Sequence, residues 1–165
     1  MVLITIGLLI FVPMLVEAGR AARNERAQKA RGGIEPRDDM YAIMRILYPA
    51  VFVAMLAEGA VRGTPSTGVL AAGIIVFALA KLVKWSAILA LGRSWTFRVV
   101  VVPGDRLVTT GPYRYLRHPN YLGVVGELAG VALMTGALVS GPLALFVFGA
   151  LLLKRIAVEE KALKI

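Results

Sequence analysis

The chain has 165 residues, of which 58% are hydrophobic, and it carries a formal net charge of +9. With a mean hydropathy of +0.75, it lacks the polar surface of a soluble domain, so composition favours an integral membrane protein with basic loops. Nucleic-acid binding is disfavoured because the basic residues lie between apolar runs and not along a polar helix face. The absence of cysteine excludes thiolate chemistry, and a single histidine, His118, argues against a metal site.

Five apolar segments predict an all-α integral membrane protein with about five transmembrane helices, forming one domain over residues 1–165. The spans are expected at residues 2–19, 42–61, 69–91, 121–139 and 143–158, because a span needs about 20 residues and basic ends can shorten it. The last two spans are expected to form a helical hairpin turning at residues 140–142. Residues 95–102 and 107–110 flank a Pro-Gly-Asp turn and favour a short β-like hairpin before the fourth helix.

The distribution of basic residues predicts the orientation in the membrane. Of the 19 lysines and arginines, only Arg62 lies in the second connection and none lies in the turn at residues 140–142. An amino terminus outside and a carboxyl terminus in the cytoplasm place all the other basic regions on the cytoplasmic side, as the positive-inside rule requires. The first apolar run has arginines after it and none before it, so we expect an anchor and not a cleaved signal peptide.

Polar and aromatic side chains are concentrated just before the fourth span, and they include Tyr113, Arg117, His118 and Tyr121. Two interpretations remain open from composition, namely a basic loop with interfacial tyrosines and a ligand site. Pro119 holds His118 out of the helical conformation and suits the first turn of the next helix. The free N–H groups at that helix start can hold an anionic group.

Glu127 lies six residues into the otherwise apolar fourth span. An acid inside a span marks a functional site by default, with a cationic partner expected, and the competing interpretation is a structural hydrogen bond to another helix. Gly123 lies on the same helical face and would let a ligand approach the backbone. Gly126 and Gly130 have the spacing of close helix packing and would permit a dimer, although the oligomeric state is not predicted.

Charged side chains gather again at the end of the last span, at Arg155, Glu159 and Glu160. Arg155 and Glu159 are four residues apart and can pair on a helix, which is the plain structural interpretation. The adjacent glutamates cannot face one direction, so one can pair with Arg155 while the other faces a polar cavity. A carboxylate there can accept hydrogen bonds from ribose hydroxyls or an ammonium group of a cofactor.

These motifs resemble the isoprenylcysteine carboxyl methyltransferase family, and related phospholipid methyltransferases share the same plan. The resemblance covers residues 91–163 and rests on Gly111-Pro-Tyr-Arg-Tyr-Leu-Arg-His-Pro-Asn-Tyr-Leu-Gly123, on Glu127 and on Arg155 followed by Glu159-Glu160. It implies a membrane methyltransferase that uses S-adenosylmethionine. The donor-binding residues it implies are Tyr113, Arg117, His118, Tyr121, Gly123, Glu159 and Glu160. Members usually continue beyond the paired glutamates with an aromatic, arginine-containing tail, whereas this sequence ends at Ile165.

The resemblance leaves the methyl acceptor open. We expect an oxygen, either a carboxylate or an enol or hydroxyl, of a lipophilic substrate at the cytoplasmic membrane face, with membrane lipids as neighbours. Such an anion needs an arginine to orient it more than a strong base, and Arg117 or Arg155 can serve. Together with Glu127, the acid inside the fourth span, they are the expected catalytic residues.

Three more specific or different functions are also compatible with these motifs. The first is O-methylation of alkylpyrone products of type III polyketide synthases, because residues 23–26 and 32–35 resemble a bacterial branch with this activity. That resemblance suggests a bacterial cytoplasmic membrane. The second function is N-methylation of a phospholipid amine, and the third is that of a non-enzymatic membrane scaffold or lipid-binding protein.

Overall fold

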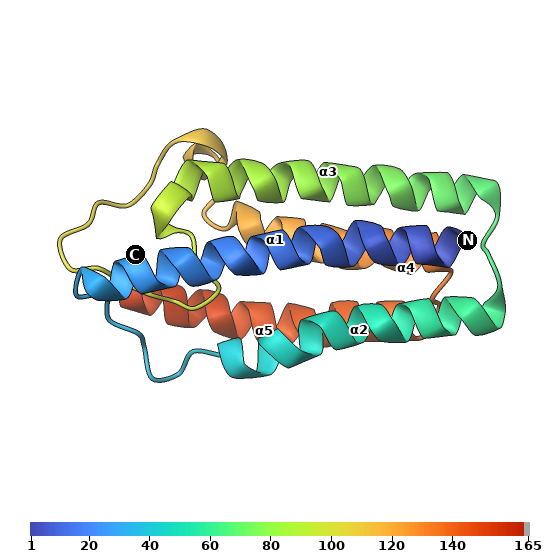
Figure 1. The fold of residues 1–165 in the computed structure, drawn as a ribbon, viewed down its shortest axis with the longest axis horizontal. Coiled ribbons are helices and arrows are strands. Elements are labelled where there is room, and N and C mark those ends of the chain that lie inside the picture. Colours follow the sequence, from blue (N-terminus) through green and yellow to red (C-terminus); the bar gives the residue numbers. More distant parts are fainter. Residues whose placement is uncertain (164–165) are drawn as a thin grey trace.

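A computed structural model describes residues 1–163, and there the chain is a bundle of five α-helices with two short 3-10 turns. The elements are, in chain order, α1 (Val2–Ala30), α2 (Tyr41–Arg62), α3 (Thr67–Leu91), η1 (Gly92–Ser94), η2 (Gly111–Arg114), α4 (Pro119–Thr135) and α5 (Ser140–Leu163). The helices run alternately along one long axis, and α1 begins at the end opposite to that where α5 ends (Figure 1). Four stretches, which are α1, α2, α3 with η1, and α5, are long and apolar enough to span a membrane. The predicted all-α integral membrane fold is therefore confirmed.

The fourth helix is shorter than expected. Its 17 residues give a length of about 26 Å, and its predicted end at residue 139 is wrong. Gly136 takes a left-handed conformation with φ 65°, and its N–H is bonded to the carbonyls of Ala132 and Leu133, which ends the helix at Thr135. The hairpin turn therefore lies at residues 136–139, and the predicted turn residues 140–142 form the first turn of α5 instead.

Glycines on α4 bring it close to α3. A Cβ atom on Gly130 would lie 2.7 Å from the Phe77 backbone nitrogen, and one on Gly126 would lie 2.7 Å from the Ala80 Cβ. Small residues of this kind allow helix backbones to approach in a membrane. The close helix packing predicted for Gly126 and Gly130 occurs within the chain, between α4 and α3. Helix α3 therefore occupies the face that these glycines would offer to a dimer partner.

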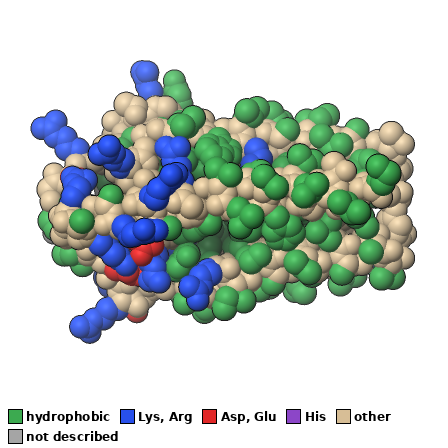
Figure 2. All heavy atoms as spheres, in the orientation of Figure 1, with side chains coloured by type: hydrophobic (Ala, Val, Ile, Leu, Met, Phe, Trp, Pro, Cys, Tyr) green, Lys and Arg blue, Asp and Glu red, His purple; other side chains and the backbone are tan. Residues whose placement is uncertain are grey.

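The two long connections, residues 31–40 and 92–118, meet at one end of the bundle (Figure 1). We call this end of the bundle the loop end. Ile34 and Val101 form an antiparallel bridge there, with N–H to carbonyl distances of 2.8 and 2.9 Å. The predicted β-like hairpin is wrong, since no strand forms within residues 1–163 and Val101 takes its partner from the first connection. Figure 2 shows lysine and arginine side chains gathered at the loop end and hydrophobic side chains over the rest of the visible surface.

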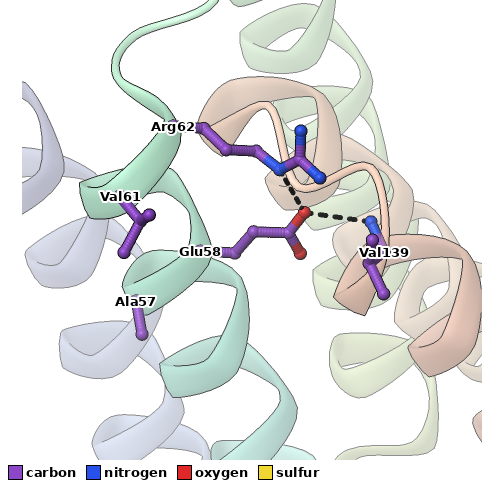
Figure 3. A pocket seen from close by; sticks show the side chains of 5 residues that line it. All are labelled: Ala57, Glu58, Val61, Arg62 and Val139. Carbon is purple, nitrogen blue, oxygen red and sulfur yellow. Dashed lines mark hydrogen bonds and ion pairs between the residues drawn. The ribbon is translucent and has the colours of Figure 1, made fainter.

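At the opposite end, Glu58 of α2 holds the turn between α4 and α5 (Figure 3). Its carboxylate accepts hydrogen bonds from the backbone N–H groups of Val139 and Ser140 at 3.0 and 2.7 Å. It is also paired with Arg62 at 2.7 Å. The first N–H groups of a helix lack acceptors within that helix, so Glu58 caps α5 from outside. This role explains an acid near the far end of the second span.

Candidate functional site

A cavity of about 540 Å³ extends from the loop end into the bundle. Its outer wall is polar and includes Tyr113, Arg117, His118, Asn120 and Glu159. Its inner wall is mainly apolar and includes Phe11, Met14, Met44, Phe148 and Leu152. The volume lies in the range of small-molecule sites, which is about 300–1,000 Å³. The cavity can therefore receive a molecule with a polar part and an apolar part.

His118 lies at the polar mouth, where two glutamates of α5 meet its ring. It precedes α4 with φ −129° and ψ 58°, the non-helical conformation expected before a proline. Its Nε2 lies 3.2 Å from Glu160 Oε1, and its Nδ1 lies 3.8 Å from Glu159 Oε2. Within residues 1–163, Glu159 Oε1 and Glu160 Oε2 have no protein hydrogen bond. Both carboxylates therefore keep an oxygen that can accept a hydrogen bond from a ligand.

Arg155 is buried, and three acceptors share its guanidinium. Its Nε donates to the Tyr121 hydroxyl at 2.9 Å, its Nη1 donates to Asp39 at 2.7 Å, and its Nη2 donates to the Phe97 carbonyl. The Tyr121 hydroxyl in turn donates to Glu159 at 2.5 Å. The ion pair between Arg155 and Glu159 that their spacing allows therefore does not form, because Asp39 pairs with the guanidinium and the Tyr121 hydroxyl lies between Arg155 and Glu159.

Asp39 is the residue at the loop end that could not be identified from the sequence. Its side chain is only 5% exposed, and it accepts the backbone N–H groups of Val99 at 2.9 Å and Tyr41 at 3.1 Å. A short acidic side chain just before a helix is a signal for a backbone cap. No local pattern points to Arg155, which lies 116 residues further along the chain. We call the connected residues the loop-end network: Asp39, Arg155, Tyr121, Glu159, His118 and Glu160.

Two further predicted donor-binding residues lie beside this network. Tyr113, in η2, lines the cavity, and burial together with the nearby Glu159 carboxylate raises the pKa of its hydroxyl well above the ordinary value. The hydroxyl therefore stays protonated and can donate a hydrogen bond. Arg117 is 75% exposed and lies 3.6 Å from Glu160. Unlike Arg155, Arg117 has its guanidinium available to a ligand.

The other two predicted site residues, Gly123 and Glu127, face α3. A Cβ atom on Gly123 would lie 2.7 Å from the Lys84 Cβ, so this glycine serves helix packing. Glu127 is paired with Lys81 at 2.9 Å and with Lys84 at 3.2 Å, and it accepts the hydroxyl of Tyr48. The cationic partner predicted for Glu127 is confirmed. Its catalytic role stays a prediction, as does the approach of a ligand to Gly123.

Glu17 of α1 completes a buried ion cluster, which consists of Glu17, Tyr48, Lys81, Lys84 and Glu127. The two oxygens of Glu17 lie 3.1 Å from Lys81 and 2.7 Å from Lys84. Two acids and two lysines make the cluster formally neutral, and such pairing is how charges are tolerated inside a span. The cavity is lined by Glu17, Tyr48 and Lys84 of this cluster.

Comparisons with known proteins identify a family and two relatives of this chain. A sequence profile of the isoprenylcysteine carboxyl methyltransferase family matches residues 72–165. The chain is 33% identical over 159 residues to YpbQ, an uncharacterized protein of Bacillus subtilis (strain 168), covering 94% of this chain and 93% of the relative. It is 28% identical over 144 residues to an uncharacterized protein of Haemophilus influenzae, covering 86% of this chain and 83% of the relative. No solved structure shows a significant match. The chain therefore belongs to the isoprenylcysteine carboxyl methyltransferase family.

Proposed function

We propose that the protein transfers a methyl group from S-adenosylmethionine to an oxygen of a lipophilic acceptor. The observation that carries this proposal is the convergence of Glu159, Glu160 and His118 at the polar mouth of a cavity with an apolar inner wall. The mouth suits a charged donor rich in hydroxyls, and the inner wall suits an apolar chain. Membership of a methyltransferase family supports methyl transfer as the reaction.

The residues at the mouth fit the polar groups of the methyl donor. The free oxygens of Glu159 and Glu160 can accept hydrogen bonds from ribose hydroxyls or from an ammonium group. Their negative charges also favour a sulfonium cation nearby. When bound, S-adenosylmethionine supplies a methyl group activated by a positively charged sulfur. The protein's part is to hold the donor, orient the acceptor and exclude water.

The arginines of the cavity favour an anionic acceptor over an amine. Arg45, Arg106 and Arg117 line the cavity and are exposed. Guanidinium groups bind carboxylate oxygens in a bidentate way, and they repel a protonated amine. A carboxylate or acidic enol is already ionised near neutral pH and needs no strong base. An isoprenylcysteine-like carboxylate and an alkylpyrone enol both meet this requirement, whereas a phospholipid amine does not.

In this proposal the loop end faces the cytoplasm of a bacterial cell. Lysine and arginine side chains gather there (Figure 2), as the positive-inside rule requires of a cytoplasmic face. The donor would reach the polar mouth from the cytoplasm, and the acceptor would reach the apolar wall from the lipid.

The acceptor is tested with purified protein, labelled S-adenosylmethionine and three acceptors: a prenylated cysteine, an alkylpyrone and a phospholipid with a primary amine. We expect the label to appear on one of the first two acceptors. Label on the amine alone would contradict O-methylation.

The donor site is tested separately with His118→Ala and Glu160→Ala, each assayed for binding of labelled S-adenosylmethionine. We expect both changes to weaken binding, because each removes a group at the polar mouth. Unchanged binding in both variants would rule out the proposed donor site and would favour a scaffold or lipid-binding role.

A further inference from the structure

We propose that Asp39 is a positioning residue for the donor site, acting through Arg155 and Tyr121 on Glu159. The inference rests on the proposed function, because it concerns how a donor-binding carboxylate is held. Asp39 lies in the connection before α2, outside residues 72–165 that match the family. It would make the amino-terminal half of the chain part of the donor site.

The hydrogen bonds that join Asp39 to Glu159 diverge from Arg155, which donates to both sides. Arg155 has donors only, so it donates to Asp39 at 2.7 Å and to the Tyr121 oxygen at 2.9 Å. The Tyr121 hydroxyl has a single hydrogen, which is directed to Glu159 Oε2 at 2.5 Å. Glu159 is thereby held by one oxygen, and its other oxygen is left for a ligand.

Asp39 is the acid that keeps Arg155 away from Glu159. Arg155 and Glu159 are four residues apart on α5, a spacing at which opposite charges pair. In the structure Arg155 is 6% exposed and its ionic partner is Asp39. Without the charge of Asp39, the buried guanidinium would need another acid, and Glu159 is within one helical turn. A direct pair between Arg155 and Glu159 would withdraw that carboxylate from the donor.

Asp39 is itself held firmly enough for this task. It accepts the backbone N–H groups of Tyr41 and Val99, so its position is set by α2 and by the segment after η1. The neighbouring Asp38 is exposed and makes no hydrogen bond or ion pair within residues 1–163. Asp38 therefore provides a matched control with the same side chain at the adjacent position.

The test measures the dissociation constant of labelled S-adenosylmethionine by equilibrium dialysis with the full-length protein in detergent. We expect Asp38→Asn to bind within about twofold of wild type, and Asp39→Asn to bind about tenfold more weakly, the scale of one charge-assisted hydrogen bond. The same pair of changes is then made in a Glu159→Gln background, where the carboxylate on which Asp39 is proposed to act is already removed. There we expect Asp39→Asn to change the affinity by less than about twofold.

Two results would overturn the inference while leaving the proposed function intact. One is wild-type affinity in Asp39→Asn, and the other is the same loss in both backgrounds, which would indicate a general structural effect. If Asp39→Asn does not fold, Arg155→Lys replaces it, because one ammonium group cannot serve Asp39 and Tyr121 as the guanidinium does. Wild-type affinity in folded Arg155→Lys would also overturn the inference. A wild-type protein that binds no donor would instead reject the proposed function, and this inference with it.

Discussion

The buried ion cluster and the loop-end network use similar side chains in different surroundings. Glu17 and Glu127 are 1% and 2% exposed, and each meets two lysines. Glu159 and Glu160 have side chains that are 28% and 29% exposed, and each keeps one oxygen without a protein partner within residues 1–163. A buried acid needs opposite charges beside it, whereas an acid at a cavity mouth can remain open to a ligand. The surroundings, more than the residue type, distinguish the structural acid from the candidate binding acid.

The largest change in stability should come from removing the acid of α4 from the buried ion cluster. Glu127→Gln leaves Lys81 and Lys84 with only Glu17, and an uncompensated buried charge costs about 3–5 kcal/mol. We expect this loss in the free energy of unfolding, measured by denaturing the protein from mild detergent micelles with sodium dodecyl sulfate. The affinity for S-adenosylmethionine of the folded fraction should change by less than about twofold.

A paired replacement provides the control for Glu127. Changing Glu127→Leu together with Lys84→Met removes one charge of each sign, so the loss of stability should be much smaller than for Glu127→Gln. If Glu127→Gln instead keeps full stability and loses donor affinity, Glu127 belongs to the binding site and the distinction between the two networks fails.

A second prediction concerns the packing that holds the buried ion cluster together. Gly130→Ala places a Cβ 2.7 Å from the Phe77 backbone nitrogen, and overpacking of this kind costs about 1–3 kcal/mol. Gly149→Ala is the matched control, because its Cβ meets no atom within 4 Å, and it should stabilise α5 by up to about 1 kcal/mol. Equal unfolding free energies for the two variants would refute the close approach of α3 and α4.

The third prediction addresses the loop-end network. Glu159→Gln keeps the shape of the side chain but removes the negative charge at the mouth, so the affinity for S-adenosylmethionine should fall about tenfold, or about 1.4 kcal/mol. Stability should change by less than about 1 kcal/mol, because this side chain is partly exposed. Lys154→Gln, a nearby exposed change, should leave the affinity unaltered. A large loss of stability with unchanged affinity would instead give Glu159 a structural role.

The smallest expected effect is a pH dependence at the loop end. Burial raises the pKa of Glu35, but hydrogen bonds from Arg98 and Lys29 outweigh it and bring the pKa below the ordinary value of 4.5. A lowered folded pKa means that this contribution to stability is present above the unfolded pKa and is lost as the pH falls through the folded pKa. The neighbouring bridge between Ile34 and Val101 should therefore loosen below about pH 4.5.

Hydrogen exchange of the Ile34 and Val101 amides, followed as the pH is lowered, measures this effect against the intrinsic exchange rate. Glu35→Gln should abolish the pH step, because the amide does not titrate. A step that persists in Glu35→Gln would assign the effect to another group.

The helical fold could be predicted because it follows from local composition. Runs of about 20 apolar residues must form helices in a membrane, and the second and third expected spans agree closely with α2 and α3. Local composition could not show that the β-like hairpin does not form, because the partner of Val101 is Ile34 in a distant connection. The end of α4 at Thr135 depends on the left-handed conformation of Gly136, one glycine among several in that region.

The candidate site was predictable where the chemistry is local in sequence. His118 before Pro119, and Glu159 beside Glu160, are visible as motifs, and the structure brings them together. The choice of ionic partners was not predictable, because it depends on tertiary contacts. Arg155 pairs with Asp39 and not with Glu159, the acid four residues away. Glu127 pairs with Lys81 and Lys84, whose side chains could equally have pointed toward the loop end.

The central claim is that the loop-end network binds S-adenosylmethionine. The most direct test irradiates labelled S-adenosylmethionine bound to the wild-type protein with ultraviolet light and maps the labelled peptides. We expect label within residues 111–123 or 155–163, and its loss when excess unlabelled S-adenosylhomocysteine is present. Label in the hollow around Glu58 at the opposite end (Figure 3), or label that the competitor does not displace, would contradict it.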